Sequence, residues 1–144
     1  MESKINVTVR MKPLSDPERA SDKNSIWSQI GENTLLNVRT KEMFSFDSVF
    51  GEGVATQEIF DRQVRELVVT AMEGINVTVF AYGQTSSGKT FTMRGVDQQP
   101  GLIPLSIAQV FDHIARDAER EYQISVSYLE VSPARSARRS TTRR

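Results

Sequence analysis

The feature that most constrains this chain is an unbroken G-x-x-x-x-G-K-[ST] sequence at residues 83–90, directly after the apolar run at residues 77–82. A strand that ends in a glycine-rich turn and continues into a helix directs several backbone N–H groups, and the positive end of the helix dipole, at one point. A phosphate chain can be held there, so the placement predicts nucleotide binding. The alternative is a serine- and glycine-rich surface turn with one exposed lysine, which would not require this order of residues.

Each residue of this loop has an expected role that follows from its chemistry. Gly83 and Gly88 allow the positive-φ or crowded backbone conformations that wrapping a phosphate requires. The ammonium of Lys89 reaches the β- and γ-phosphate oxygens, and the hydroxyl of Thr90 is a ligand for Mg²⁺. The residues between the glycines mainly supply N–H groups: Gln84, Thr85, Ser86 and Ser87.

Length and composition narrow the class of protein. The chain has 144 residues, which is enough for one domain with a core but short for a complete nucleotide-hydrolysing machine. It has no cysteine, which excludes disulfides and thiolate metal sites, and its single histidine cannot form a metal cluster. No apolar stretch approaches the length of a membrane span, and no signal-peptide pattern follows Met1. We therefore expect a soluble, cytosolic protein without a membrane partner.

Charge is unevenly distributed, although 18 basic residues balance 18 acidic ones. Residues 132–144 hold five arginines, no acid and no large apolar residue, so residues 1–131 carry the compensating negative charge. We expect residues 132–144 to form a disordered, arginine-rich tail. Such a tail either binds an acidic partner through salt-sensitive contacts or binds nothing specific, and we expect no specific nucleic-acid partner.

Hydrophobic periodicity predicts an α/β domain with crossover helices. The expected strands are residues 4–10, 34–40, 44–50, 77–82 and 124–131. The expected helices run from Thr56 to Gly74, from about Lys89 to a break at Gly95, and over residues 103–118. Thr56 is the expected N-cap of the first helix and Gly74 its C-terminal stop. Apolar residues at core spacing on these helices are Phe60, Val64, Leu67, Val68, Ala71, Ile107, Val110, Phe111 and Ile114.

Two further side chains have expected structural roles. Trp27 lies in the polar, irregular stretch of residues 14–33 and is expected to cover part of the core. Asp47 stands between strand-forming aromatic residues, where a turn or capping role is expected rather than general-base catalysis.

Several segments, in the right order, resemble kinesin motor domains. Residues 79–93, Val-Phe-Ala-Tyr-Gly-Gln-Thr-Ser-Ser-Gly-Lys-Thr-Phe-Thr-Met, are similar to the kinesin nucleotide loop almost letter for letter. Residues 7–13 resemble the first-strand signature that ends in Arg-x-Arg-Pro, with Lys12 in place of the second arginine. Residues 44–50, 101–104 and 126–131 resemble the family's F-x-F-D-x-V-F, G-[LI]-I-P and V-S-Y-x-E-I segments. The acidic loop and Trp27 resemble the centromere-associated branch of the family.

The resemblance implies a P-loop NTPase of the kinesin type, with a layered sheet and flanking helices that are incomplete in this chain. It implies ATP and Mg²⁺ as cofactors, Lys89 and Thr90 as catalytic positions, and Thr90 as the metal ligand. It also implies that Arg10 and Pro13 flank the adenine while Phe91 stacks from the other side, where many family members have His or Tyr. For the complete motor it implies microtubules (tubulin) as the partner and a cytoplasmic, microtubule-associated location.

The resemblance covers residues 4–131 and departs from the family at Val131, where kinesins continue Tyr-Asn-Glu. The switch I sequence N-x-x-S-S-R-S-H and the switch II sequence D-L-A-G-x-E do not occur in these 144 residues. We therefore divide the chain into the N-terminal part of a kinesin motor domain, 1–131, and the tail, 132–144. We expect the change at Val131 to reflect a shifted reading frame or a retained intron, with a true truncation as the alternative.

Two functions follow from this division. The first is the ATP-binding part of a microtubule motor whose complete form couples ATP hydrolysis to movement. The second is a truncated, non-hydrolysing fragment that acts at most as a binding or interfering module. A third reading, a different P-loop NTPase such as a kinase, requires an acceptor-substrate pocket that the sequence does not indicate.

Overall fold

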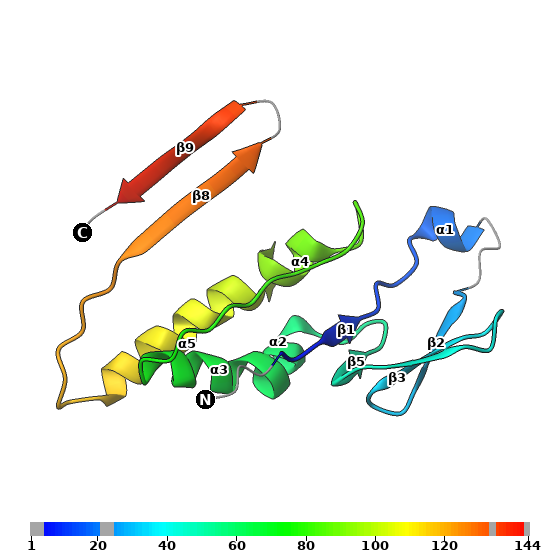
Figure 1. The fold of residues 1–144 in the computed structure, drawn as a ribbon, viewed down its shortest axis with the longest axis horizontal. Coiled ribbons are helices and arrows are strands. Elements are labelled where there is room, and N and C mark those ends of the chain that lie inside the picture. The colour runs from blue at the N-terminus through cyan, green and yellow to red at the C-terminus, as the bar shows by residue number, and fades with distance from the viewer. Residues whose placement is uncertain (1–4, 21–24, 133–134, 143–144) are drawn as a thin grey trace. The chain divides into compact units, whose positions relative to one another are not determined.

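The computed structural model describes residues 5–20, 25–132 and 135–142 (Figure 1). Contacts along the chain divide it into two compact units, Met1–Asp112 and His113–Arg144. The helical segments of the first unit are α1 (Asp16–Ala20), α2 (Thr56–Ile59), a π-helical turn η1 (Phe60–Val64), α3 (Arg65–Met72), α4 (Lys89–Met93) and most of α5 (Leu102–Arg116). Its strands are β1 (Thr8–Arg10), β2 (Trp27–Ile30), β3 (Thr34–Asn37), β4 (Met43–Ser45), β5 (Ser48–Phe50), β6 (Gly95–Val96) and β7 (Gln99–Pro100).

The strands of the first unit form three small sheets. β1 pairs with β5 in parallel, with Val9 opposite Val49, and β2, β3 and β4 form an antiparallel sheet in that order. β6 and β7 form a two-stranded antiparallel pair between α4 and α5. The stretch at residues 14–33, predicted to be irregular, therefore contains α1 and β2 among its described residues.

The strand predicted over residues 44–50 is divided between two sheets. β4 pairs with β3, whereas β5 pairs with β1. Asp47 lies at the division: its carboxylate accepts a hydrogen bond from the Val7 N–H at 2.7 Å, and its own N–H donates to the Val7 carbonyl at 3.1 Å. Asp47 therefore has a structural role, but it differs from the predicted turn or capping role: both contacts join the start of β5 to the segment before β1.

The core of the first unit lies where β5, the α2–η1 segment and the start of α5 meet. Its buried side chains are Phe50, Ile59, Phe60, Val64 and Leu102. The helix predicted from Thr56 to Gly74 exists and ends at Met72. The π-helical turn in its middle changes the helical spacing, and Leu67 is 36% exposed instead of facing the core.

The two predicted ends of this helix have different outcomes. The predicted N-cap role of Thr56 is wrong: Ala55 occupies the cap position without a side-chain cap, and Thr56 is a buried residue inside the helix. The stop at Gly74 is confirmed, because its N–H donates to the Ala71 carbonyl and the N–H of Ile75 donates to the Thr70 carbonyl. That pair of bonds is the Schellman arrangement.

The prediction of a buried strand at residues 77–82 is wrong for this structure. These residues are not assigned to a strand, and Phe80 and Tyr82 are 78% and 95% exposed. A strand needs a neighbour to receive its backbone hydrogen bonds, and no described strand pairs with this segment. A missing neighbour also explains α5. Its expected core residues Ile107 and Phe111 are 51% and 57% exposed, because an apolar face is buried only where another element covers it.

The second unit contains the end of α5 and a hairpin of β8 (Val126–Ser132) and β9 (Arg135–Thr142), paired antiparallel. The strand predicted at 124–131 is thus present, shifted slightly toward the C-terminus. Of the predicted tail, residues 135–142 form β9, paired with β8; the character of residues 132–144 as a disordered tail stays a prediction. Pairing with β8 requires only backbone N–H and C=O groups, so the lack of apolar residues does not prevent it. The division of the chain at Val131 stays a prediction.

None of the helices in the described parts of the chain is both long and apolar enough to cross a membrane.

Candidate nucleotide-binding site

The loop at residues 83–90 connects the extended segment 77–82 to α4, which begins at Lys89. Gly88 occupies the position before α4 with φ 94°, a left-handed conformation that side chains disfavour. A Cβ atom added to Gly83 would lie 2.6 Å from Oγ of Ser87, because the loop folds back over this glycine. Gly83 has φ 153°, so both glycines have the positive φ that the sequence predicts for this loop.

Lys89 closes the loop on itself. Its Nζ donates hydrogen bonds to the carbonyl oxygens of Gly83 at 2.8 Å and Gln84 at 2.7 Å, and the N–H of Ser87 donates to the same Gln84 carbonyl at 3.2 Å. No carboxylate in the described parts of the chain forms an ion pair with Lys89. The ammonium thus lies at the centre of the loop with its charge available to an anion.

The remaining loop residues are open to solvent. Gln84, Thr85, Ser86 and Thr90 are exposed, and Ser86 has φ 65°. The hydroxyl of Thr90 has no hydrogen-bond partner in residues 5–20, 25–132 and 135–142. The described residues also contain no group of three or more His, Asp or Glu side chains that could hold a metal by themselves. The Thr90 hydroxyl without a carboxylate cluster fits Mg²⁺ in the way that protein sites commonly bind it. The protein supplies few of the oxygen ligands, and phosphate and water supply the rest.

Arg10, at the end of β1, joins two distant segments of the chain. Its Nη1 donates to Oγ1 of Thr56 at 2.9 Å and to Oγ1 of Thr92 at 3.1 Å, and its Nη2 donates to the Val54 carbonyl at 3.0 Å. Burial lowers the pKa of the Arg10 guanidinium from its ordinary value. The group remains charged at neutral pH, because the ordinary pKa of arginine is far above that range.

The guanidinium of Arg10 also lies over the ring of Phe91, 5.0 Å from its centroid. A flat base held between two flat groups needs about 7 Å between them, which is two van der Waals contacts of about 3.5 Å. The observed separation is smaller, so Arg10 covers one face of Phe91 directly. Pro13, the other predicted base contact, is exposed in the segment that follows β1.

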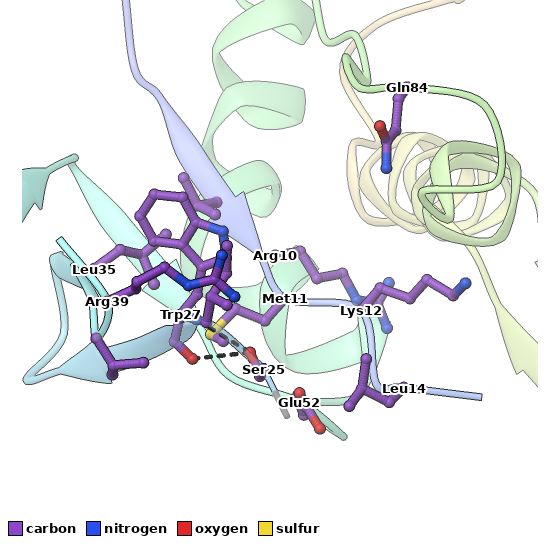
Figure 2. A pocket seen from close by; sticks show the side chains of 13 residues that line it. Arg10, Met11, Lys12, Leu14, Ser25, Trp27, Leu35, Arg39, Glu52 and Gln84 are labelled. Carbon is purple, nitrogen blue, oxygen red and sulfur yellow. Dashed lines mark hydrogen bonds between the residues drawn. The ribbon is translucent and has the colours of Figure 1, made fainter. Parts of the chain in front are cut away.

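Near these residues, an open pocket of about 950 Å³ lies between the β2–β3–β4 sheet and the loop (Figure 2). Figure 2 shows Trp27, Leu35 and Arg39 on one side of it and Gln84 on the other. Arg10 and Lys12 also line the pocket. Among the predicted site residues, Arg10 and Gln84 line this pocket, whereas Pro13, Lys89, Thr90 and Phe91 are not part of its lining. Trp27, predicted to cover the core, is 37% exposed and packs edge-on against Phe44 with ring centroids 5.7 Å apart.

Sequence reasoning missed the residues that hold Arg10. The sequence predicts a cap role for Thr56 and no role for Thr92 or Val54. Thr56 and Thr92 lie 46 and 82 residues from Arg10 in sequence. No local pattern connects residues so far apart, so only the tertiary contacts of the Arg10 side chain identify them.

Comparison with known proteins gives a consistent family assignment. Residues 10–134 match the family described as kinesin motor domain. The chain is 42% identical over 132 residues to the Kinesin-like protein KIN-7C, mitochondrial, of Arabidopsis thaliana, covering 91% of this chain and 15% of that relative. It is 46% identical over 129 residues to KIN-7D, mitochondrial, of the same organism, covering 88% of this chain and 12% of that relative.

A solved structure agrees with the sequence matches. The structure described as "Structure of a fast kinesin: Implications for ATPase mechanism and interactions with microtubules" superimposes with a TM-score of 0.86 at 34% identity. The match covers 94% of this chain and 40% of that one, so the chain has part of the kinesin α/β fold. It spans less than a sixth of the length of the two curated relatives. On both sequence and fold, the chain belongs to the kinesin motor domain family.

Proposed function

We propose that this chain binds ATP with Mg²⁺ as the nucleotide-binding part of a kinesin motor. The observation that carries the proposal is the loop at residues 83–90, in which two glycines permit a tight turn around the ammonium of Lys89. A lysine with several donors and no carboxylate partner among the described residues can exchange loop carbonyls for phosphate oxygens.

The proposed division of labour follows the chemistry of each residue. Lys89 holds the β- and γ-phosphates, and the backbone of residues 83–88 supplies N–H groups to the phosphate chain. Thr90 contributes a hydroxyl oxygen to Mg²⁺, which when bound neutralises phosphate charge. Phe91 and Pro13 bind the base, with Arg10 beside them. The role of each of these residues is a proposal, as are the two cofactors.

For the complete protein we propose ATP hydrolysis coupled to movement along microtubules. Family membership supports this, since the solved relative is described in terms of an ATPase mechanism and interactions with microtubules. We also propose a cytoskeletal, cytoplasmic location. The names of the relatives do not agree on one compartment, because KIN-7C and KIN-7D are called mitochondrial and KIN-7E of Oryza sativa subsp. japonica is called chloroplastic.

The test is isothermal titration calorimetry of the 144-residue chain with ATP in the presence of MgCl₂. The wild-type chain is expected to bind ATP, and Lys89→Ala to weaken binding about 10- to 100-fold, since charge-assisted hydrogen bonds contribute about 1.5–3 kcal/mol. Lys41→Ala is the matched control, because Lys41 is exposed in the turn between β3 and β4. Equal affinity of wild type and Lys89→Ala, or equal losses in Lys89→Ala and Lys41→Ala, would refute the proposed phosphate site.

A further inference from the structure

The guanidinium of Arg10 is held by three acceptors that come from two separate segments of the chain. Thr56 is the first residue of α2 and Val54 lies two residues before that helix, whereas Thr92 comes from α4, the helix that follows the phosphate loop. Thr56 is only 3% exposed and is the one buried polar residue in the described part of the chain. A buried hydroxyl that accepts from a charged donor is costly to replace by an apolar group, because the donor then loses its partner.

The opposite surface of this guanidinium lies against Phe91. At 5.0 Å from the centroid there is no room for a base between the two groups, so a base that stacks on Phe91 must use the ring face that Arg10 does not cover. Arg10 therefore cannot be the second plane of a sandwich on Phe91 in this arrangement. Arg10 instead restrains the Phe91 ring from the face opposite the base, through a cation–π contact.

We propose that Thr56 and Thr92 are positioning residues for recognition of the base: they hold Arg10 against Phe91 and so orient the ring on which a purine stacks. The inference rests on the proposed nucleotide binding. It adds two residues that do not contact the ligand directly. It also changes the role of Arg10, which supports the Phe91 ring instead of stacking on the base. A ring that is already oriented loses less conformational freedom when the base binds, which favours affinity.

A purely structural role for the same cluster makes a different prediction. If the hydrogen bonds only joined β1 to α2 and α4, their loss would disturb the whole site, including the phosphate loop next to α4. Binding of the base and binding of the phosphates would then fall together. The two roles are separated by comparing ATP with inorganic tripolyphosphate, which has the phosphate chain but no base.

The experiment measures dissociation constants of both ligands, with MgCl₂, for wild type, Thr56→Val, Thr92→Val and the double variant. In the double variant the dissociation constant for ATP is expected to rise about tenfold, as for loss of hydrogen bonds to a charged group. The constant for tripolyphosphate is expected to change by less than about twofold. Substitution of both threonines by serine keeps the hydroxyls and is expected to restore ATP binding. Thr70→Val is the matched control, because the Thr70 hydroxyl donates to the Glu66 carbonyl within α3.

The outcomes separate this inference from the proposed function. If wild type binds both ligands but the valine variants weaken both by the same factor, or weaken neither, the positioning role is refuted and nucleotide binding stands. If the folded wild-type chain binds neither ligand, the proposed function itself is refuted. Should the double variant fail to fold, judged by its thermal unfolding transition, Thr92→Val alone decides, since Thr92 is only half-buried and Thr56 remains in place.

Discussion

Replacing Phe60 by alanine tests whether the small core described above holds the first unit together. Phe60 is 2% exposed and packs in the core cluster with Phe50, Ile59, Val64 and Leu102. A Phe→Ala change in such a core costs about 3–5 kcal/mol, from the lost transfer free energy and the cavity that remains. The guanidinium of Arg65, 5.3 Å from the ring centroid, also loses a contact of about 0.5–1 kcal/mol.

This cost is large against the about 5–15 kcal/mol that a typical domain has in total. At about 4 °C per kcal/mol for a chain of this size, the unfolding midpoint is expected to fall by about 12–20 °C. The assay is thermal unfolding followed by circular dichroism, with urea unfolding as an independent measure of the free energy.

Phe80→Ala provides the matched control, because it removes the same atoms from a side chain that is 78% exposed. A change of less than about 0.5 kcal/mol is expected there, as for most surface substitutions. Equal loss of stability in the two variants would refute the assignment of the core. A larger loss for Phe80→Ala would mean that the segment at residues 77–82 is covered in solution.

Two further predictions concern catalysis and titration. The 144-residue chain is expected to release phosphate from ATP at the background rate, with or without microtubules. The reason is that the switch sequences, which in P-loop enzymes complete the metal site and position the attacking water, do not occur in it. Microtubule-stimulated turnover in a steady-state phosphate-release assay would contradict this prediction and the non-hydrolysing alternative. In the second unit, the Tyr122 hydroxyl, followed by the Glu119 N–H, lowers the pKa of the Asp117 carboxyl. A lowered pKa stabilises the folded state above the ordinary value of about 3.9, and this contribution is lost as the pH falls through the lowered pKa. Tyr122→Phe is therefore expected to raise the Asp117 titration midpoint toward its ordinary value in an NMR titration, and an unchanged midpoint would disprove the role of the hydroxyl.

Local features of this chain were predictable because their causes lie within a few residues. The turn at Gly83 and Gly88 and the start of α4 at Lys89 follow from the spacing of glycine and lysine. The Schellman end of α3 likewise needs only Gly74 and the carbonyls of the preceding turn. Alternation at residues 44–50 correctly indicated extended backbone, but it could not show that the chain changes sheets at Asp47.

Burial and partners were predicted less well, because both depend on what lies opposite a residue. Apolar residues at 77–82 and along α5 indicated faces to be covered, and several of them are exposed in this structure. Thr56 is the converse case, a polar residue that the structure buries. Its sequence context is that of a helix cap, whereas its burial and its bond to Arg10 follow from how β1 packs beside α2.

The proposed ligand could be inferred from consecutive residues, because the loop at residues 83–90 is continuous in the chain and its chemistry depends on the order of its glycines, lysine and threonine. The surroundings of Arg10, in contrast, follow only from the tertiary structure. Arg10, Thr56, Phe91 and Thr92 become neighbours through folding, because they lie on segments that are far apart in the chain.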